Sequence, residues 1–111
     1  MSILKNHEPL VSVIMPVYNE EQFLPRSLGS LLANDYPAEK VELIVVDGRS
    51  TDRSRQIVQE YQRKNPHRRI QLLDNPKRII PVGLNIGLYH AQGEIIIRAD
   101  AHTVYAPDYI R

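Results

Sequence analysis

Asp100 and His102 are the residues whose types and spacing most readily suggest chemistry. They stand two positions apart, shortly after three isoleucines at 95–97, and side chains at this spacing in an extended segment point to the same side. A carboxylate and an imidazole can hold a divalent cation. Its remaining ligands would come from water and, if the ligand is a nucleoside diphosphate, from the phosphates of that ligand. An Asp-x-His pair alone is more often an ordinary loop, so this predicted metal site depends on the buried strand before it.

A second polar cluster begins at Asp47, which follows the largely apolar block at 41–46. Its carboxylate is placed to accept a hydrogen bond from a nucleobase N–H group or a ribose hydroxyl. Gly48 allows a tight turn and the close approach of a ligand to the backbone. The sequence Ser-Thr-Asp at 50–52 is typical of a helix N-terminal cap.

A third polar cluster, Pro-Val-Tyr-Asn-Glu at 16–20, follows the apolar block at 11–15. Pro16 fixes the direction in which the chain leaves the strand. Tyr18 offers a flat face to a base, and Glu20 can accept a hydrogen bond. The alternative is a simple turn from strand to helix that Asn19 caps.

Apolar blocks alternate with segments of helical periodicity along the chain. We expect strands at 11–15, 41–46, 70–73 and 95–97. Helices are expected from residue 21 or 22, after the cap at 50–52 and at Pro81, with another opening at Pro107. This order predicts an α/β fold with a parallel sheet of about four strands and helices on both faces. Ligands bind beyond the carboxyl ends of such strands, so the three polar clusters are expected to share one crevice.

The composition narrows the possible classes of protein. The chain has 111 residues, which suits one domain, and its net charge of +1 predicts no nucleic-acid partner. The absence of cysteine excludes disulfides, cysteine-ligated zinc and a thiol nucleophile. No apolar run approaches the roughly 20 residues of a membrane helix, and the first ten residues lack a signal-peptide pattern. The basic stretch at 63–69 is interpreted as solvated surface, and we expect a cytoplasmic location.

Four motifs, taken in order, resemble those of family-two glycosyltransferases. The segment VSVIMPVYNE at 11–20 is similar to that family's first strand and nucleotide loop. The segment LIVVDGRSTD at 43–52 is similar to its second strand and Asp-Gly-Ser-x-Asp turn. Residues 83–87 and 91–95 resemble the helix and strand that lead to the metal motif, and Asp-Ala-His at 100–102 falls where the family has Asp-x-Asp. The resemblance extends from 11 to 111.

This resemblance implies a GT-A glycosyltransferase domain, of which residues 1–111 would be the Rossmann-like part that binds the nucleotide sugar. The implied reaction transfers a sugar, with inversion, from a nucleoside diphosphate donor, most often a UDP-sugar, to a carbohydrate or lipid-linked acceptor. Asp-Ala-His is similar to the motif of members related to exopolysaccharide synthesis. By position, the nucleotide-binding residues would be Pro16, Val17, Tyr18, Glu20, Asp47, Asn75, Arg78 and Asp100, and the metal ligands would be Asp100 and His102.

Two features depart from the family's pattern. His102 replaces an acidic ligand, and because imidazole suits manganese better than magnesium, we expect Mn²⁺ to be preferred over Mg²⁺. The resemblance also implies a longer domain, so the general base is expected beyond Arg111, and this chain is expected to bind the donor without completing catalysis. Attachment to the inner face of a membrane would depend on regions outside this chain. The isoleucines at 95–97 suit burial on both faces, and an incomplete sheet would favour self-association.

Three other classes of protein are weighed against this interpretation. A non-catalytic module that binds a nucleotide or nucleotide sugar would share the same pocket and differ only in lacking turnover. A dinucleotide-binding oxidoreductase needs a Gly-x-Gly-x-x-Gly turn after the first strand, where this chain has Pro-Val-Tyr-Asn-Glu. A receiver domain would use Asp47 as phosphoacceptor, but it needs an acidic pair after the first strand, which here ends in Met15-Pro16.

Overall fold

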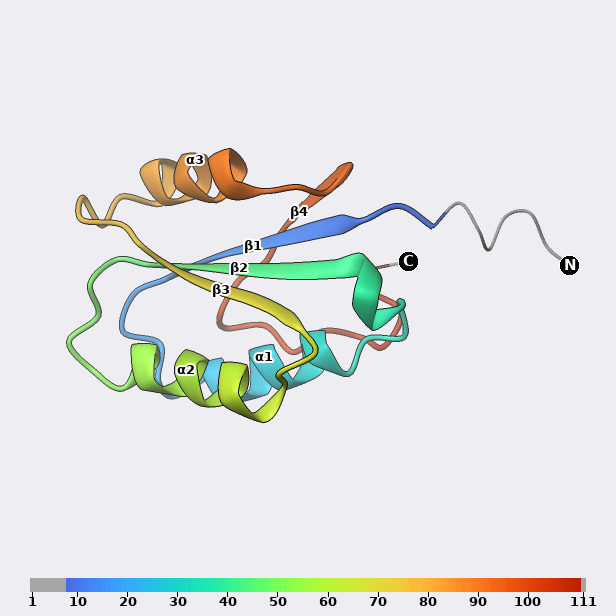
Figure 1. Ribbon diagram of the computed structural model, residues 1–111. Coiled ribbons are helices and arrows are strands. Elements are labelled where there is room, and N and C mark those ends of the chain that lie inside the picture. Colours follow the sequence, from blue (N-terminus) through green and yellow to red (C-terminus); the bar gives the residue numbers. More distant parts are fainter. Residues whose placement is uncertain (1–7, 111) are drawn as a thin grey trace, which may run out of the picture.

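The computed structural model describes residues 8–110 and forms a single sheet with helices on both faces (Figure 1). All strand pairs are parallel, and their spatial order is β3-β2-β1-β4. This confirms the α/β fold and the strand order along the chain that the sequence predicts. The elements are β1 (Val11–Val17), α1 (Leu24–Leu32), the short 3₁₀ helix η2 (Ala38–Lys40), β2 (Val41–Asp47), α2 (Ser54–Lys64), β3 (Arg69–Asp74), α3 (Ile80–His90) and β4 (Ile95–Arg98).

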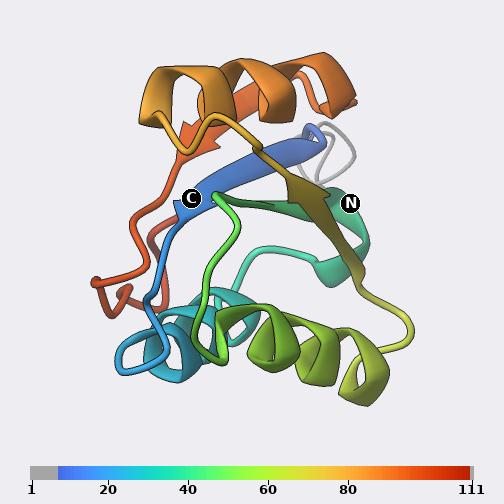
Figure 2. The same ribbon diagram turned by 90° about the vertical axis from the view of Figure 1, so that its left-hand side faces the viewer.

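Helix α3 covers one face of the sheet, whereas α1 and α2 cover the other (Figure 2). The larger apolar cluster lies on the side of α1 and α2 and includes Val13, Leu28 and Val58. The smaller cluster, on the side of α3, contains Ile14, Ile44 and Val46. Because β1 and β2 occupy the centre of the sheet, both their faces are covered, which explains why these two strands are almost continuously apolar.

Glycine at position 87 lets α3 pack closely against β1. A Cβ atom built at Gly87 would lie 2.5 Å from Cγ2 of Ile14, closer than carbon atoms can approach without a shift. The helix therefore comes nearer to the sheet than a residue with a side chain would permit. This close approach brings the start of α3 over the carboxyl ends of β1 and β2.

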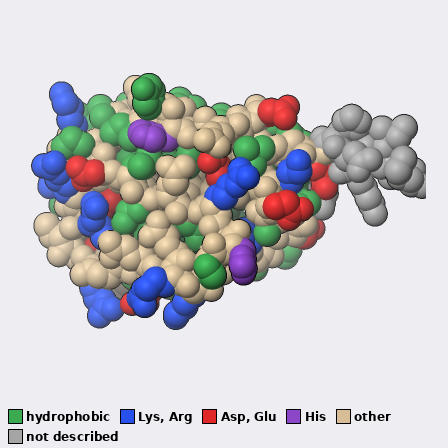
Figure 3. Space-filling model, in the orientation of Figure 1, with side chains coloured by type: hydrophobic (Ala, Val, Ile, Leu, Met, Phe, Trp, Pro, Cys, Tyr) green, Lys and Arg blue, Asp and Glu red, His purple; other side chains and the backbone are tan. Residues whose placement is uncertain are grey.

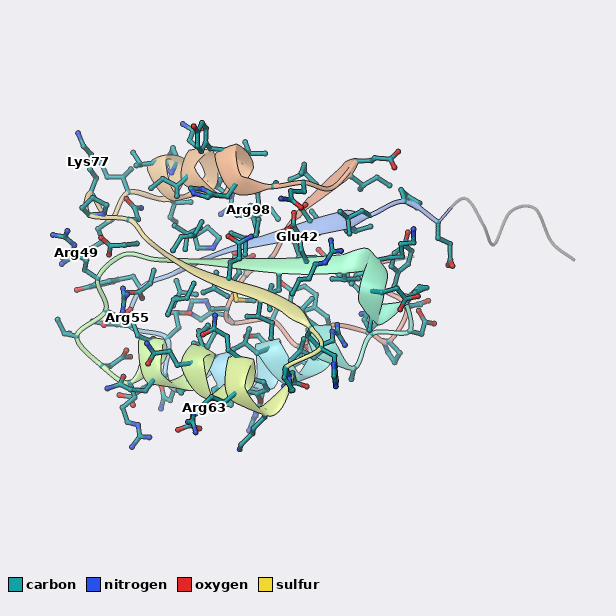
Figure 4. All side chains as sticks on the ribbon, viewed as in Figure 1. Glu42, Arg49, Arg55, Arg63, Lys77 and Arg98 are labelled. Atoms are coloured by element: carbon teal, nitrogen blue, oxygen red, sulfur yellow. The ribbon has the colours of Figure 1, made fainter. Side chains whose placement is uncertain are left out.

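A buried carboxylate fixes the loop between α3 and β4 at the opposite end of the sheet. Glu42 (labelled in Figure 4) accepts hydrogen bonds from Ser12 Oγ at 2.6 Å and from the backbone N–H of Gln92 at 2.5 Å. The backbone N–H of Gly93 donates to Ser12 Oγ at 2.8 Å. These bonds hold the start of β4 beside β1, so they help to position the residues that follow β4.

Ile95 and Ile96 are 46% and 42% exposed, because β4 is at the edge of the sheet and within residues 8–110 pairs only with β1. This is the exposed apolar edge expected of an incomplete sheet, and self-association stays a prediction. Two other expectations from the sequence are wrong in detail. The helix expected at Pro107 is a turn, in which the Tyr109 N–H donates to the Ala106 carbonyl at 3.0 Å. At the start of α2, the N-cap position belongs to Arg53, and the Asp52 carboxylate accepts from the N–H of Ser54 at 2.9 Å.

No helix within residues 8–110 is long and apolar enough to cross a membrane.

The carboxyl ends of the strands meet at one edge, where Val17 pairs in register with Asp47 and Asp47 with Asp74. Figure 2 looks onto this edge, and the three polar clusters leave the sheet here, as expected. The edge is therefore where a ligand site can form.

Candidate functional site

A cleft opens at the carboxyl ends of the strands. Every predicted site residue except Asp47 lines it, and so do four residues that the sequence analysis did not assign to the site. The full lining is Pro16, Val17, Tyr18, Glu20, Val46, Gly48, Asn75, Arg78, Ile80, Asp100, Ala101 and His102. These residues come from the ends of β1, β2, β3 and β4 and from the start of α3.

Tyr18 and Arg78 form one wall of the cleft. The guanidinium carbon of Arg78 lies 4.3 Å from the centroid of the Tyr18 ring, within the range of a cation–π interaction. Arg78 Nε donates to the carbonyl of Gly48 at 3.2 Å, and the Arg78 backbone has a φ of 63°. Left-handed backbone at a residue with a side chain is uncommon and often occurs at ligand sites.

Asn75 shapes the turn that presents Arg78. Its side chain is 3% exposed; Nδ2 donates to the carbonyl of Ile79 at 3.0 Å, and Oδ1 accepts from the N–H of Lys77 at 3.2 Å. The backbone carbonyl of Asn75 accepts from the N–H of Arg78 at 3.2 Å. Although Asn75 lines the cleft, one of its two side-chain N–H donors and one acceptor position of Oδ1 serve the turn at 75–79.

Asp47 is 1% exposed, and its carboxylate faces its own turn. Oδ2 accepts from the Ser50 N–H at 3.0 Å and from Arg55 Nη1 at 3.0 Å, and Oδ1 accepts from Ser50 Oγ at 2.5 Å. A carboxylate has roughly four acceptor positions, so at most one remains for a ligand. These contacts show a carboxylate that organises the turn at 47–55, and a bond to a base remains a prediction.

Arg55 is a residue that the sequence analysis missed. It reaches from the first turn of α2 to both Asp47 and Asp74, at 3.0 and 3.5 Å, while Arg49 pairs with Asp74 at 3.3 Å. Figure 4 labels Arg49, Arg55 and Lys77 at this end of the molecule, and Lys and Arg side chains gather there in Figure 3. Near the cleft, the charges of Arg49 and Arg55 are therefore balanced by Asp47 and Asp74, and Arg78 is the arginine that lines the cleft itself.

The opposite wall holds Asp100, His102 and Glu20. The side chains of Asp100 and His102 are 65% and 62% exposed. His102 Nδ1 lies 2.8 Å from Glu20 Oε2, and the His102 ring is 5.1 Å from that of Phe23 between centroids. The contact between Glu20 and His102 has the distance of an ion pair but not the geometry of a hydrogen bond, since this buried carboxylate oxygen accepts none within residues 8–110.

Burial raises the pKa of the Glu20 carboxyl. His102 opposes this shift, while the neighbouring carboxylates of Asp52 and Asp100 add to it. A buried carboxylate oxygen that lacks a hydrogen-bond donor is costly, and cations and donor groups stabilise its charged form. Because this oxygen is buried, the His102 imidazole at 2.8 Å is the group placed to stabilise its charged form.

The donors present fit an incomplete metal site. Within residues 8–110, no group of three His, Cys, Asp or Glu side chains is arranged to hold a metal ion. Asp100 and His102, which both line the cleft, could supply one oxygen and one nitrogen donor. Magnesium and manganese commonly take their other ligands from water and substrate phosphates, so the pair suits a cation that arrives with an anionic ligand.

In an open parallel α/β sheet, ligands bind in a crevice at the carboxyl ends of the strands, and the polar cleft of this chain lies there. The comparisons with known proteins then identify the family. Residues 12–111 match the family model described as "Glycosyl transferase family 2". The chain belongs to this family of glycosyltransferases.

Several curated relatives are similar to this chain in sequence. The chain is 32% identical over 101 residues to dolichyl N-acetyl-alpha-D-glucosaminyl phosphate 3-beta-D-2,3-diacetamido-2,3-dideoxy-beta-D-glucuronosyltransferase of Methanococcus voltae, covering 91% of this chain and 32% of the relative. It is 35% identical over 96 residues to poly(ribitol-phosphate) beta-N-acetylglucosaminyltransferase TarS of Staphylococcus aureus, covering 81% of this chain and 16% of TarS. The chain therefore spans a third or less of these relatives.

Solved structures share the fold. The mannosyltransferase PcManGT from Pyrobaculum calidifontis, in complex with GDP-Man and Mn²⁺, superposes with a TM-score of 0.86 at 34% identity, covering 91% of this chain and 30% of that protein. TarS 1–349 of S. aureus in complex with UDP superposes with a TM-score of 0.78 at 30% identity, covering 90% of this chain and 29% of that one. These likenesses confirm the expected glycosyltransferase fold.

Four of the lining residues were absent from the predicted site. Gly48 was singled out for its turn and for the close approach of a ligand but not assigned to the site. Val46, Ile80 and Ala101 gave no signal, because ordinary apolar residues line a cleft only through the tertiary fold. Arg55 could have been suspected, since an arginine in the first turn of the helix after Asp47 can reach back to it. The sequence thus indicated the polar side chains that line the cleft, together with Pro16 and Val17, and missed its other apolar members.

Proposed function

We propose that this chain forms the donor-binding part of an inverting glycosyltransferase that uses a nucleoside diphosphate sugar, with UDP as the nucleotide. The observation that carries the proposal is the meeting of two walls at one cleft. Tyr18 and Arg78 offer a flat, cationic surface on one side, while Asp100 and His102 offer metal donors on the other. The acceptor would be a hydroxyl of a carbohydrate or of a lipid-linked molecule.

Arg78 is the residue best placed to recognise the nucleotide. Its Nε donates a hydrogen bond to the carbonyl of Gly48, and within residues 8–110 no hydrogen bond uses its two terminal nitrogens. Those N–H groups can donate to base carbonyl oxygens or to phosphate oxygens. GDP-Man and UDP complexes of the two similar proteins support a nucleotide here; uracil is our proposal for the base, and guanine is the competing outcome of the test.

Asp100 and His102 would hold a divalent cation together with the diphosphate. Such a cation neutralises the negative charge that develops on the leaving diphosphate. We propose Mn²⁺ in preference to Mg²⁺, because imidazole nitrogen is a poorer ligand for magnesium than carboxylate oxygen. The Mn²⁺ in the PcManGT complex supports a metal of this kind.

Inverting transfer also needs a carboxylate that deprotonates the acceptor hydroxyl as it attacks the sugar. We propose that this base lies in the part of the family's proteins that this chain does not span. The chain would then bind the donor without transferring the sugar. A non-catalytic binding module would bind in the same way, and only turnover by a chain of the relatives' length separates the two.

Calorimetric titration of matched arginine variants tests the nucleotide wall. Arg78→Ala should weaken UDP binding about tenfold or more, the usual effect of losing charge-assisted hydrogen bonds. Arg63→Ala, an exposed arginine in the last turn of α2 (labelled in Figure 4), is the control and should bind like the parent. If Arg78→Ala and the parent bound UDP with equal affinity, Arg78 would not be a nucleotide-binding residue.

We further propose that β4 is a site of self-association, since Ile95 and Ile96 are exposed at the edge of the sheet. Exposed apolar edge strands tend to pair with other chains. Light scattering should show dimers or larger species that Ile96→Lys reduces to monomers. A parent that stays monomeric at high concentration would contradict this proposal.

A further inference from the structure

One tyrosine hydroxyl holds both backbone polar groups of Asp100. The N–H of Asp100 donates to the Tyr105 hydroxyl at 2.5 Å, and the same hydroxyl donates to the Asp100 carbonyl at 3.0 Å. Tyr105 is 8% exposed, so this contact is shielded from water. A single side chain therefore fixes the backbone of the residue that carries the carboxylate of the metal pair.

Tyr105 is itself attached to the core. Its backbone N–H donates to Ser30 Oγ in α1 at 2.8 Å, and its ring packs on Tyr109 with 4.4 Å between centroids. The turn that follows is tied to the end of α1, because Asn34 Nδ2 donates to the Ala106 carbonyl at 2.9 Å and its Oδ1 accepts from the Ile110 N–H at 3.1 Å. The hydroxyl is thus held by α1 and its neighbours and not by the loop it supports.

Asp100 lies between two buried alanines. Ala99 and Ala101 are both buried, and the Ala99 N–H donates to the Ile14 carbonyl at 2.9 Å. The Asp100 side chain between them is 65% exposed and lines the cleft, and its Oδ1 lies 4.0 Å from Nη2 of Arg98. Tyr105 therefore fixes the backbone from which the Asp100 carboxylate projects at the cleft.

We propose that Tyr105 is a positioning residue for the Asp100–His102 pair. This inference rests on the proposed function, since it assigns Tyr105 to the binding of the metal and, through it, of the diphosphate. Without the hydroxyl, the Asp100 N–H and carbonyl would lose their shielded partner, and the remaining contact from the Thr103 N–H to that carbonyl is long, at 3.4 Å. The loop would then relax to find water, and the metal donors would lose their arrangement.

Tyr105→Phe tests this inference, because phenylalanine keeps the ring and its packing and removes only the hydroxyl. Tyr61→Phe is the matched control: its hydroxyl donates to one carbonyl, that of Pro25 at 2.9 Å, away from the cleft. Nucleotide affinity is measured by calorimetry with Mn²⁺ and with EDTA. Tyr105→Phe should weaken binding about three- to tenfold in Mn²⁺, the size expected for lost hydrogen bonds, and leave binding in EDTA unchanged.

A measurement without ligand separates the inference from the proposed function. Amide hydrogen exchange of Asp100, followed by NMR, should be faster in Tyr105→Phe than in the parent and in Tyr61→Phe. Unchanged exchange at Asp100, or equal loss of affinity in Mn²⁺ and EDTA, would overturn the positioning role. A parent that binds no nucleotide would overturn the proposed function and, with it, the link between Tyr105 and the metal.

Discussion

Replacing Asp47 with asparagine separates a structural role for this residue from a role in binding the base. The carboxylate is 1% exposed and accepts three hydrogen bonds, one of them from the Arg55 guanidinium. Breaking a buried ion pair usually costs about 3–5 kcal/mol. Because solvent partly screens Arg55, Asp47→Asn should lower the free energy of unfolding by about 2–4 kcal/mol. That is a large part of the roughly 5–15 kcal/mol that stabilises a domain.

The free energy of unfolding is measured by urea titration with linear extrapolation. Asp108→Asn, at an exposed turn position, is the control and should change stability by less than about 0.5 kcal/mol. Asp100→Ala should abolish metal-dependent binding at little cost in stability, since its side chain is exposed. The reasoning is refuted if Asp47→Asn keeps the parent's stability and loses only nucleotide binding, because the carboxylate would then act on the ligand.

Three further predictions concern packing, protonation and metal choice. Gly87→Val should destabilise the fold by about 1–3 kcal/mol in thermal unfolding, because even a Cβ there meets Ile14; a variant as stable as the parent would show that α3 shifts freely. Burial raises the pKa of the Glu20 carboxyl in the folded protein above its unfolded value, which is near 4.5. The free energy of unfolding is therefore highest below pH 4.5, where Glu20 is protonated in both states, and it falls as pH rises through the pKa of the folded protein. Glu20→Gln should therefore stabilise the ligand-free protein at neutral pH and not below about pH 4, and a gain at both pH values would point to another cause. His102→Asp should shift the preference for Mn²⁺ toward Mg²⁺ in nucleotide titrations, whereas an unchanged ratio of affinities would exclude His102 as a ligand.

The order of elements was predictable from the sequence because it depends on local pattern. The apolar blocks at 11–15 and 41–46 form strands buried on both faces, and such strands carry a strong signal. The polar clusters after them could be placed in one crevice, because parallel strands carry their following loops to one edge. Fold class and the polar members of the cleft follow from these two facts.

What could not be predicted depends on contacts between distant segments. The position of Asp47 at the end of a strand predicts a carboxylate that faces a ligand. In the structure, this carboxylate instead accepts hydrogen bonds from Ser50 and Arg55. The hydroxyl of Tyr105 meets Asp100 only because the turn after β4 packs on α1 through Ser30.

The central claim is that a nucleoside diphosphate and a divalent cation bind together in the cleft between Arg78 and Asp100. Calorimetric titration of the parent and of Asp100→Ala with UDP and with GDP, each in Mn²⁺ and in EDTA, tests it most directly. We predict that the parent binds UDP more tightly in Mn²⁺ than in EDTA and that Asp100→Ala loses this difference. Binding that is absent, or equal in both conditions for a folded parent, would contradict the account.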